Sequence, residues 1–205
     1  MLMIRIVILW FLSMFAFWGV SAQNAMSVLN KTITSYNSAN GMSANYSVKS
    51  PQGSSSGKID MCGKKFRIIS SDMKCWYDGV TQWTYSGATD EVNVSAPSVE
   101  DMQMSNPYVA LASLKKNCYV YKAFTQVSGF YTIKLVPKKK DNEFKQILLY
   151  VTNGTYTIGK AYFEMKSGTS YTIKITNYKV ARLDESIFSF DKKYVPAGVE
   201  VVDLR

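Results

Sequence analysis

The sequence predicts a mainly β fold in which an antiparallel sheet packs against helices. Short runs rich in β-branched and aromatic residues follow one another, with Gly, Asn and Ser at the turns between them. The first runs lie too close together for crossover helices, so their strands must form an antiparallel meander. Several later runs, such as Tyr171–Thr176, alternate polar and apolar residues, which predicts a sheet with one solvent-exposed face and one buried face.

The N-terminus carries the features of a signal peptide. Met1–Arg5 is short and basic, Ile6–Val20 is apolar, and Val20-Ser21-Ala22 ends in the small residues that precede a cleavage site. Cleavage after Ala22 would leave residues 23–205 as a single mature domain. A retained membrane anchor is the alternative, because the apolar run is nearly long enough to span a bilayer. Gln23, rather than Cys, at the predicted cut excludes a lipid anchor of the bacterial type.

The first half of the mature chain is predicted to contain one helix and then strands. Apolar residues spaced three and four apart predict an amphipathic helix over Asn24–Asn40, with Gly41 at its C-terminal cap. The composition of Ser50–Gly57 predicts a flexible loop. The expected strands, in chain order, are Met42–Lys49, Lys58–Cys62, Phe66–Ser70, Cys75–Tyr77, Gln82–Ser86 and Glu91–Ala96.

The turn at Asp78-Gly79 predicts a hairpin whose second arm has an aromatic face. Because side chains alternate along a strand, Trp83 and Tyr85 share one face, and Gln82, Thr84 and Ser86 share the other. The aromatic face either packs as ordinary core or meets a ligand.

A short helix is predicted to interrupt the strands in the middle of the chain. Asn106-Pro107 resembles an N-cap followed by proline at the first helical position, and Lys115-Lys116 suits the C-terminal end. Asn153-Gly154 is the strongest hairpin signal in the chain. The strands expected after the helix are Tyr119–Thr125, Phe130–Pro137, Phe144–Val151, Tyr156–Met165 and Tyr171–Val180.

Histidine is absent from the sequence, which removes the commonest general base, the usual nucleophile triads and most zinc sites. We therefore predict no catalytic residue, no metal site and no cofactor, and expect that the protein is not an enzyme. Cys62, Cys75 and Cys118 lack the close spacing of a redox or zinc motif. They are either buried apolar residues or one disulfide with one thiol left over.

The chain is basic, with a formal net charge of +9. A basic balance suggests nucleic acid as a partner, but an exported destination argues against it. An acidic membrane surface or acidic protein suits the charge better, and a soluble basic surface without a partner is the plain alternative. Lys138–Lys140 is interpreted as a solvated hairpin tip, with a docking site as the alternative.

Three local motifs occur in a characteristic order. Asp78–Tyr85 (DGVTQWTY) resembles a D-G-x-x-x-W-x-Y hairpin, and Asn106–Leu111 (NPYVAL) resembles a lid helix that opens with a polar residue, proline and an aromatic. Phe188–Phe190 followed by Pro196–Asp203 resembles an F-x-F…P-x-G-V-x-V-x-D ending. Over the mature chain the sequence is similar to the periplasmic outer-membrane lipoprotein carriers (LolA-like).

This resemblance implies a strongly curved antiparallel sheet that forms an incomplete barrel, with helices covering its concave apolar face. It implies a monomeric periplasmic carrier that binds the acyl chains of lipoproteins. Such a carrier takes acylated lipoproteins from an inner-membrane ABC-type release complex and delivers them to an outer-membrane acceptor. The acceptor is itself a lipoprotein, so Gln23 at the predicted cut favours the carrier.

The resemblance also implies an acyl-chain cavity lined by apolar residues of the strands and the mid-chain helix. No residue is assigned to hold the lid, since Gly63-Lys64-Lys65 stands where the family often has an arginine. A lipid- or lipoprotein-sensing regulatory protein of the same fold, and a binding module with a filled core, are the alternatives. The predicted cavity residues are Phe66, Ile68, Trp76, Trp83, Tyr85, Tyr108, Leu111, Leu114, Leu148 and Ile173.

Overall fold

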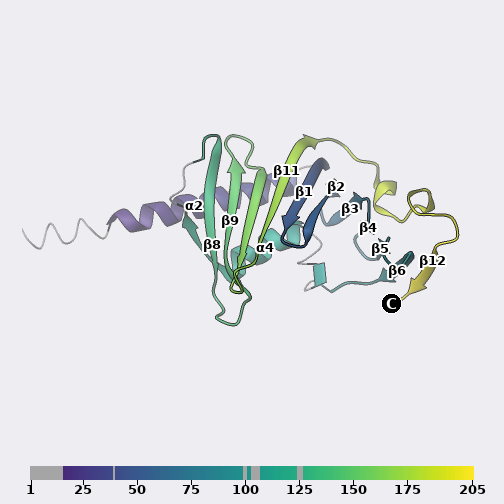
Figure 1. The fold of residues 1–205 in the computed structure, drawn as a ribbon. Coiled ribbons are helices and arrows are strands. Elements are labelled where there is room, and N and C mark those ends of the chain that lie inside the picture. The colour runs from purple at the N-terminus through teal and green to yellow at the C-terminus, as the bar shows by residue number, and fades with distance from the viewer. Residues whose placement is uncertain (1–15, 39, 99–100, 103–106, 124–126) are drawn as a thin grey trace, which may run out of the picture.

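One twelve-stranded sheet organises the molecule. The computed structural model describes residues 16–38, 40–98, 101–102, 107–123 and 127–205. The strands lie side by side in Figure 1, and the two edge strands, β12 and β7, lie far apart. The sheet is curved and its edges do not meet, so the predicted mainly β class with an unclosed sheet is confirmed.

The first six strands form the predicted meander. The hairpin turn at Asp78-Gly79 is confirmed: Gly79 has φ 108°, and the Asp78 carboxylate accepts from the backbone N–H groups of Val80 and Thr81. The prediction of a flexible loop over residues 50–57 is wrong, because pairing with β1 gives these small polar residues backbone partners. The strands are β1 (Met42–Ser50), β2 (Gly53–Cys62), β3 (Lys65–Ser70), β4 (Met73–Tyr77), β5 (Gln82–Ser86) and β6 (Glu91–Ser95).

The next five strands form a second antiparallel meander, and β11 pairs with β1 to join the two into one sheet. The turn at Asn153-Gly154 is confirmed, with Gly154 at φ 86°. The strands are β7 (Cys118–Lys122), β8 (Phe130–Pro137), β9 (Phe144–Thr152), β10 (Ile158–Met165) and β11 (Ser170–Val180).

The C-terminal segment adds elements that the sequence pattern did not predict. Two 3₁₀ helices, η1 (Glu185–Phe188) and η2 (Lys192–Tyr194), begin at Asp184 and Asp191, whose side chains cap them. The last strand, β12 (Glu200–Asp203), pairs parallel to β6 and forms one edge of the sheet.

In the described part of the chain, two α-helices pack against the strands. Helix α2 (Ala16–Ser38) begins earlier than predicted, and α4 (Pro107–Asn117) ends at its two lysines as predicted. In Figure 1 α2 crosses the strands of the second meander, and its residues contact β7, β8 and α4. Among the described residues, no helix combines the length and apolar character needed to cross a bilayer.

The larger hydrophobic core lies between these helices and the sheet, and we call it the helix-side core. Leu29 and Tyr36 of α2 are buried in it, and Met26 and Ile33 pack at its margin, which confirms the predicted apolar face of that helix. The strands contribute buried residues from both meanders, including Ala44, Met61, Phe66, Cys75, Val120, Leu135, Leu149, Val151 and Ala161.

A smaller aromatic cluster lies on the opposite face of the first meander, and we call it the C-terminal cluster. Cys75 and Tyr77 belong to the helix-side core, so Trp76, which lies between them on β4, points the other way. Trp76 has no exposed surface and meets Phe190 edge to face, with ring centroids 5.4 Å apart. The C-terminal segment therefore covers the sheet face that the helices leave open at this end.

A buried ion pair anchors the C-terminal segment. Asp60 on β2 is 1% exposed, and Arg67 on β3 donates to it at 2.7 Å and to the Tyr194 hydroxyl at 3.2 Å. Burial by itself would raise the pKa of Asp60. Hydrogen bonds from Ser43, Arg67 and Lys58 outweigh burial and hold this pKa below its ordinary value.

The substitution Asp60→Asn should lower the free energy of unfolding at neutral pH by about 3 kcal/mol, because the largely buried Arg67 guanidinium loses its counter-charge. Since the folded-state pKa of Asp60 is depressed, its stabilisation is fully present above the ordinary carboxyl pKa of about 4 and is lost as the pH falls from there through the lower folded-state pKa. Urea unfolding should therefore separate the two proteins at pH 7 and bring them together in acid. A difference that stays constant with pH would contradict this role of Asp60.

Candidate functional site

The helix-side core brings together half of the predicted cavity residues. Phe66 and Leu111 are buried in it, and Ile68, Leu114 and Ile173 pack against it with part of their surface exposed. These five come from β3, α4 and β11, segments far apart in the sequence. The apolar surface shared by the sheet and the helices is therefore the candidate site.

The predicted aromatic stripe is not part of this surface. Trp83 and Tyr85 share a face, as expected, but they pack with Trp76 in the C-terminal cluster and not opposite Leu111. Alternation predicts which residues share a face of β5 but not what covers that face. The helix side of β5 carries Gln82 and Thr84 instead, and Thr84 lies 3.5 Å from the Cys75 sulfur.

Leu148 also lies on the face away from the helices. Its neighbours Ile147 and Leu149 are the buried residues that β9 contributes to the helix-side core. All three are apolar, so the alternation along this strand gave no signal of which one points inward. Tyr108 lies within α4, and its side chain falls outside the described part of the structure.

The helix α2 supplies residues that the predicted site omitted. Val28 and Leu29 are buried, and the Tyr36 hydroxyl accepts a hydrogen bond from the backbone N–H of Ile158 at 3.3 Å. The three-and-four spacing of apolar residues on this helix was the available signal. Burial raises the pKa of Tyr36 to about 12, so its hydroxyl stays neutral at physiological pH.

The centre of the candidate site is tightly packed. Leu29, Leu135 and Val151 have no exposed surface, while Met26 and Ile33 at the margin of α2 are only partly buried. A ligand that reached the buried centre would have to displace side chains of α2 or move the helix.

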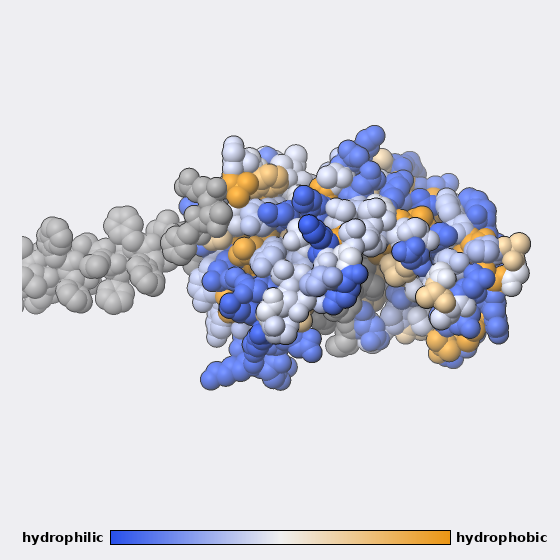
Figure 2. Space-filling model, in the orientation of Figure 1, coloured by the Kyte–Doolittle hydropathy of each residue, from blue (hydrophilic) through white to orange (hydrophobic). Residues whose placement is uncertain are grey.

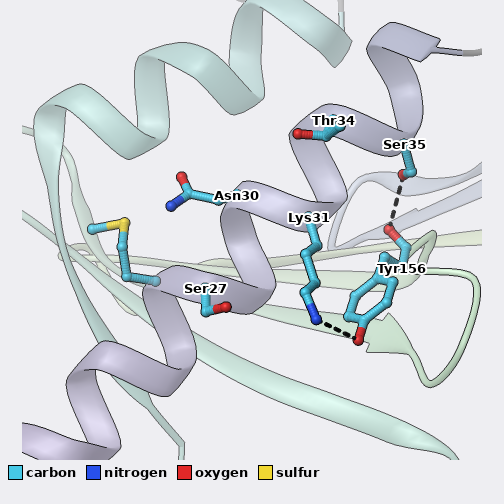
Figure 3. A pocket seen from close by; sticks show the side chains of 7 residues that line it. Ser27, Asn30, Lys31, Thr34, Ser35 and Tyr156 are labelled. Carbon is cyan, nitrogen blue, oxygen red and sulfur yellow. Dashed lines mark hydrogen bonds between the residues drawn. The ribbon is translucent and has the colours of Figure 1, made fainter.

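An open groove of about 670 Å³ runs beside α2 (Figure 3). Figure 3 shows Lys31 reaching from the helix to the hydroxyl of Tyr156, which lies between β9 and β10. The residues that line the groove are Met26, Ser27, Asn30, Lys31, Thr34, Ser35 and Tyr156.

Polar contacts tie α2 to the sheet at this groove. Lys31 donates to the Tyr156 hydroxyl at 3.2 Å and lies 4.9 Å from the centre of its ring. Ser35 donates to the Tyr156 carbonyl at 3.3 Å, and Tyr131 stacks on the ring at 5.8 Å. The hydrogen bond from Lys31 lowers the pKa of Tyr156, since it favours the tyrosinate. Tyr156 also has φ 55°, which is unusual for a bulky residue.

The cysteines and acidic residues of the described segments form no metal-binding cluster of three or more ligand groups. Cys62, Cys75 and Cys118 are all free thiols, so the possibility of a single disulfide is not realised. Burial raises the pKa of Cys75 to about 11, which keeps its thiol protonated and unreactive. Cys75 and Cys118 are buried apolar residues, in agreement with one of the two predicted roles.

Solved structures resemble this one at low sequence identity. An uncharacterised conserved protein from Thermus thermophilus is 14% identical, with 88% of this chain and 99% of that chain covered and a TM-score of 0.61. MucB in the Pseudomonas aeruginosa MucA/MucB complex is 10% identical, with 84% and 62% covered and a TM-score of 0.52. A LolA superfamily protein from Nitrosomonas europaea is 14% identical, with 82% and 98% covered and a TM-score of 0.43.

A comparison with curated proteins found no match. The model of one protein family, described as outer membrane lipoprotein carrier protein LolA, matches residues 12–169. That match spans more than half of the sequence and includes α2, α4 and most of the sheet. The chain therefore belongs to the outer membrane lipoprotein carrier protein LolA family.

Proposed function

We propose that this protein binds the acyl chains of lipoproteins and carries them across the periplasm from the inner to the outer membrane. The observation that supports it best is the construction of the helix-side core. An amphipathic helix lies over an apolar sheet surface, and polar contacts at the groove margin tie α2 to that surface. Such a helix can move while the sheet beneath it keeps its hydrogen bonds. The proposed role is binding and transport, without catalysis.

The energetics of acyl chains favour partial burial. Transfer of a sixteen-carbon chain from water to an apolar site is worth roughly 12 kcal/mol, at about 0.8 kcal/mol per CH₂. Three such chains would exceed the practical ceiling of about 18–21 kcal/mol for non-covalent affinity. Because α2 side chains already fill the site, the net free energy of binding is only the difference between the contacts that the acyl chain makes and the helix contacts that it replaces. The protein can therefore hold an acyl chain and still release it.

In this proposal α2 and α4 cover the concave face of the sheet, and residues 1–22 are a signal peptide cleaved after Ala22. The remaining residues, 23–205, form one domain in the periplasm, and all the α2 residues of the helix-side core lie after the cut. The mature protein acts as a monomer that takes acylated lipoproteins from an inner-membrane ABC-type complex and delivers them to an outer-membrane acceptor.

The substitution Ile68→Gln should weaken binding of a fluorescent fatty acid about tenfold, because it places an amide at the margin of the helix-side core. Leu148→Gln is the matched control, since Leu148 is also partly buried but points away from the helices. Binding by the control should stay within about twofold of the unmodified protein. Fluorescence titration measures both affinities, and thermal unfolding checks that both variants fold.

Mass spectrometry of the protein purified without detergent should also detect bound acylated peptides. If the protein carries none and binds no fatty acid, the carrier proposal fails, and a binding module with a filled core explains the structure better. Equal losses in Ile68→Gln and Leu148→Gln would place the ligand elsewhere.

The substitution Lys31→Met should loosen α2 by removing the hydrogen bond to Tyr156, which is worth about 1 kcal/mol. Hydrogen exchange of the α2 amides should become about fivefold faster, and exchange in β1 and β2 should not change. Lys49→Met is the control, because it removes an exposed lysine far from the groove. Unchanged exchange in α2 would show that the Tyr156 contact does not hold the helix.

A second candidate function is a regulatory protein that senses lipid or lipoprotein. MucB resembles this protein over 84% of this chain and was solved as a complex with MucA. Its binding to a protein partner supports this alternative. Affinity capture from membranes should then recover one regulatory membrane protein. A carrier should instead recover many different lipoproteins.

A further inference from the structure

The positive charge of the protein is concentrated in one part of the chain. Residues 107–180 contain twelve lysines, no arginine and three acidic residues, a net charge of +9 that equals the charge of the whole chain. This stretch forms α4 and the second meander, β7 to β11. The first meander and the C-terminal segment are close to neutral by comparison.

Several of these lysines lie on the sheet face that the helices leave uncovered. Ile133, Leu135 and Ala161 point into the helix-side core, so by alternation Lys134 and Lys160 point away from it. The strand register places a lysine of the neighbouring strand on the same face.

Lys160 on β10 lies directly opposite Lys174 on β11. Lys138–Lys140, at the turn between β8 and β9, extend the positive surface beyond the strands. In Figure 2 blue residues are scattered among paler ones over the second meander, and a blue protrusion lies at the lower left, where Figure 1 places the turn.

The lysines are largely without acidic partners. Within the described segments Lys145 alone among the twelve forms an ion pair, at 2.6 Å from Glu164. Two like charges directly opposite each other on neighbouring strands, as at Lys160 and Lys174, repel and destabilise a sheet. An external anionic surface would compensate for this repulsion.

Tyrosines accompany the lysines on the same face. Tyr119 and Tyr121 on the edge strand β7 are 53% and 46% exposed, and Tyr121 lies opposite Lys134. The Lys138 ammonium lies 5.9 Å from the centre of the Tyr119 ring. Tyrosine has an apolar ring and a polar hydroxyl, and lysine has an apolar stem and a charged end. Both therefore suit the boundary between lipid headgroups and water.

We propose that this surface, the lysine face, docks the protein on membranes that contain anionic phospholipids. It consists of Tyr119, Tyr121, Lys134, Lys138–Lys140, Lys160 and Lys174. Charge complementarity identifies an anionic partner, and the form of the surface favours a membrane over an acidic protein. The charges are spread along the sheet, and none of them is an arginine, the residue suited to bidentate pairing with carboxylates. The proposal is independent of acyl-chain binding, which uses the opposite face.

Vesicle sedimentation tests the proposal with the full chain. One set of vesicles contains phosphatidylcholine alone, and the other contains equal parts of phosphatidylcholine and phosphatidylglycerol. Binding should be far stronger to the anionic vesicles and should weaken steeply as salt is added. The neutral vesicles measure the background from the apolar N-terminal run, Ile6–Val20.

A variant with Lys139→Gln, Lys140→Gln and Lys174→Gln should bind anionic vesicles roughly a hundredfold more weakly, at about fivefold for each lysine lost. The matched control carries Lys64→Gln, Arg182→Gln and Lys192→Gln, which remove the same charge from exposed positions outside the second meander. The control should stay within about twofold of the unmodified protein.

Equal losses in both variants would overturn the proposal, because net charge alone would then explain binding. So would equal binding to neutral and anionic vesicles. Soluble polyglutamate provides the remaining comparison. If the lysine face binds this polymer but not the anionic vesicles, an acidic protein is the partner and the membrane proposal fails.

Discussion

Alternation of side chains along the strands is the constraint on which the rest of this structure depends. Each strand of the sheet sends neighbouring residues to opposite faces, so apolar residues on both faces require two separate covers. Helix α2 packs on one face, where it contacts β7 and β8, and the C-terminal segment covers part of the other. Where neither lies, as on the outer face of the second meander, lysine and tyrosine face water. The three surfaces of the molecule follow from this division.

The two covers are held by different kinds of interaction. The C-terminal segment is held by aromatic packing around Trp76 and by the buried pair of Asp60 and Arg67. Helix α2 is held by apolar contacts and by polar contacts to Tyr156 beside an open groove. Breaking a buried ion pair costs several kcal/mol, whereas exchange of partly exposed polar contacts for water costs about one. The polar contacts of the helix are therefore the weaker set, and a ligand in the candidate site would have to replace the apolar contacts of α2.

Turn chemistry and strand alternation predicted most of the fold, because the glycines of Asp78-Gly79 and Asn153-Gly154 accept the positive φ that a tight turn needs. The strand bounds were predicted to within a few residues, and the buried face of α2 was predicted as well.

The candidate site was harder to predict than the fold. Trp83 and Tyr85 were correctly placed on one face of β5, but the cover of that face comes from a distant segment, and local periodicity carries no information about it. Leu148 lies in a run of apolar residues, so polar–apolar alternation does not indicate which face of the sheet it occupies. The pairing of residues 53–57 and of β12 depends on neighbouring strands, which override weak local preference.

The position of β12 has a consequence for the order of folding. Strand β6 has no partner on its outer side until Glu200–Asp203 pair with it, and Trp76 is enclosed only when residues 190–199 dock over it. A chain that emerges from its N-terminus first must therefore leave Trp76 exposed until these residues have been made. Docking of Phe190, Tyr194 and Val199 is thus also the step that removes Trp76 from contact with other chains.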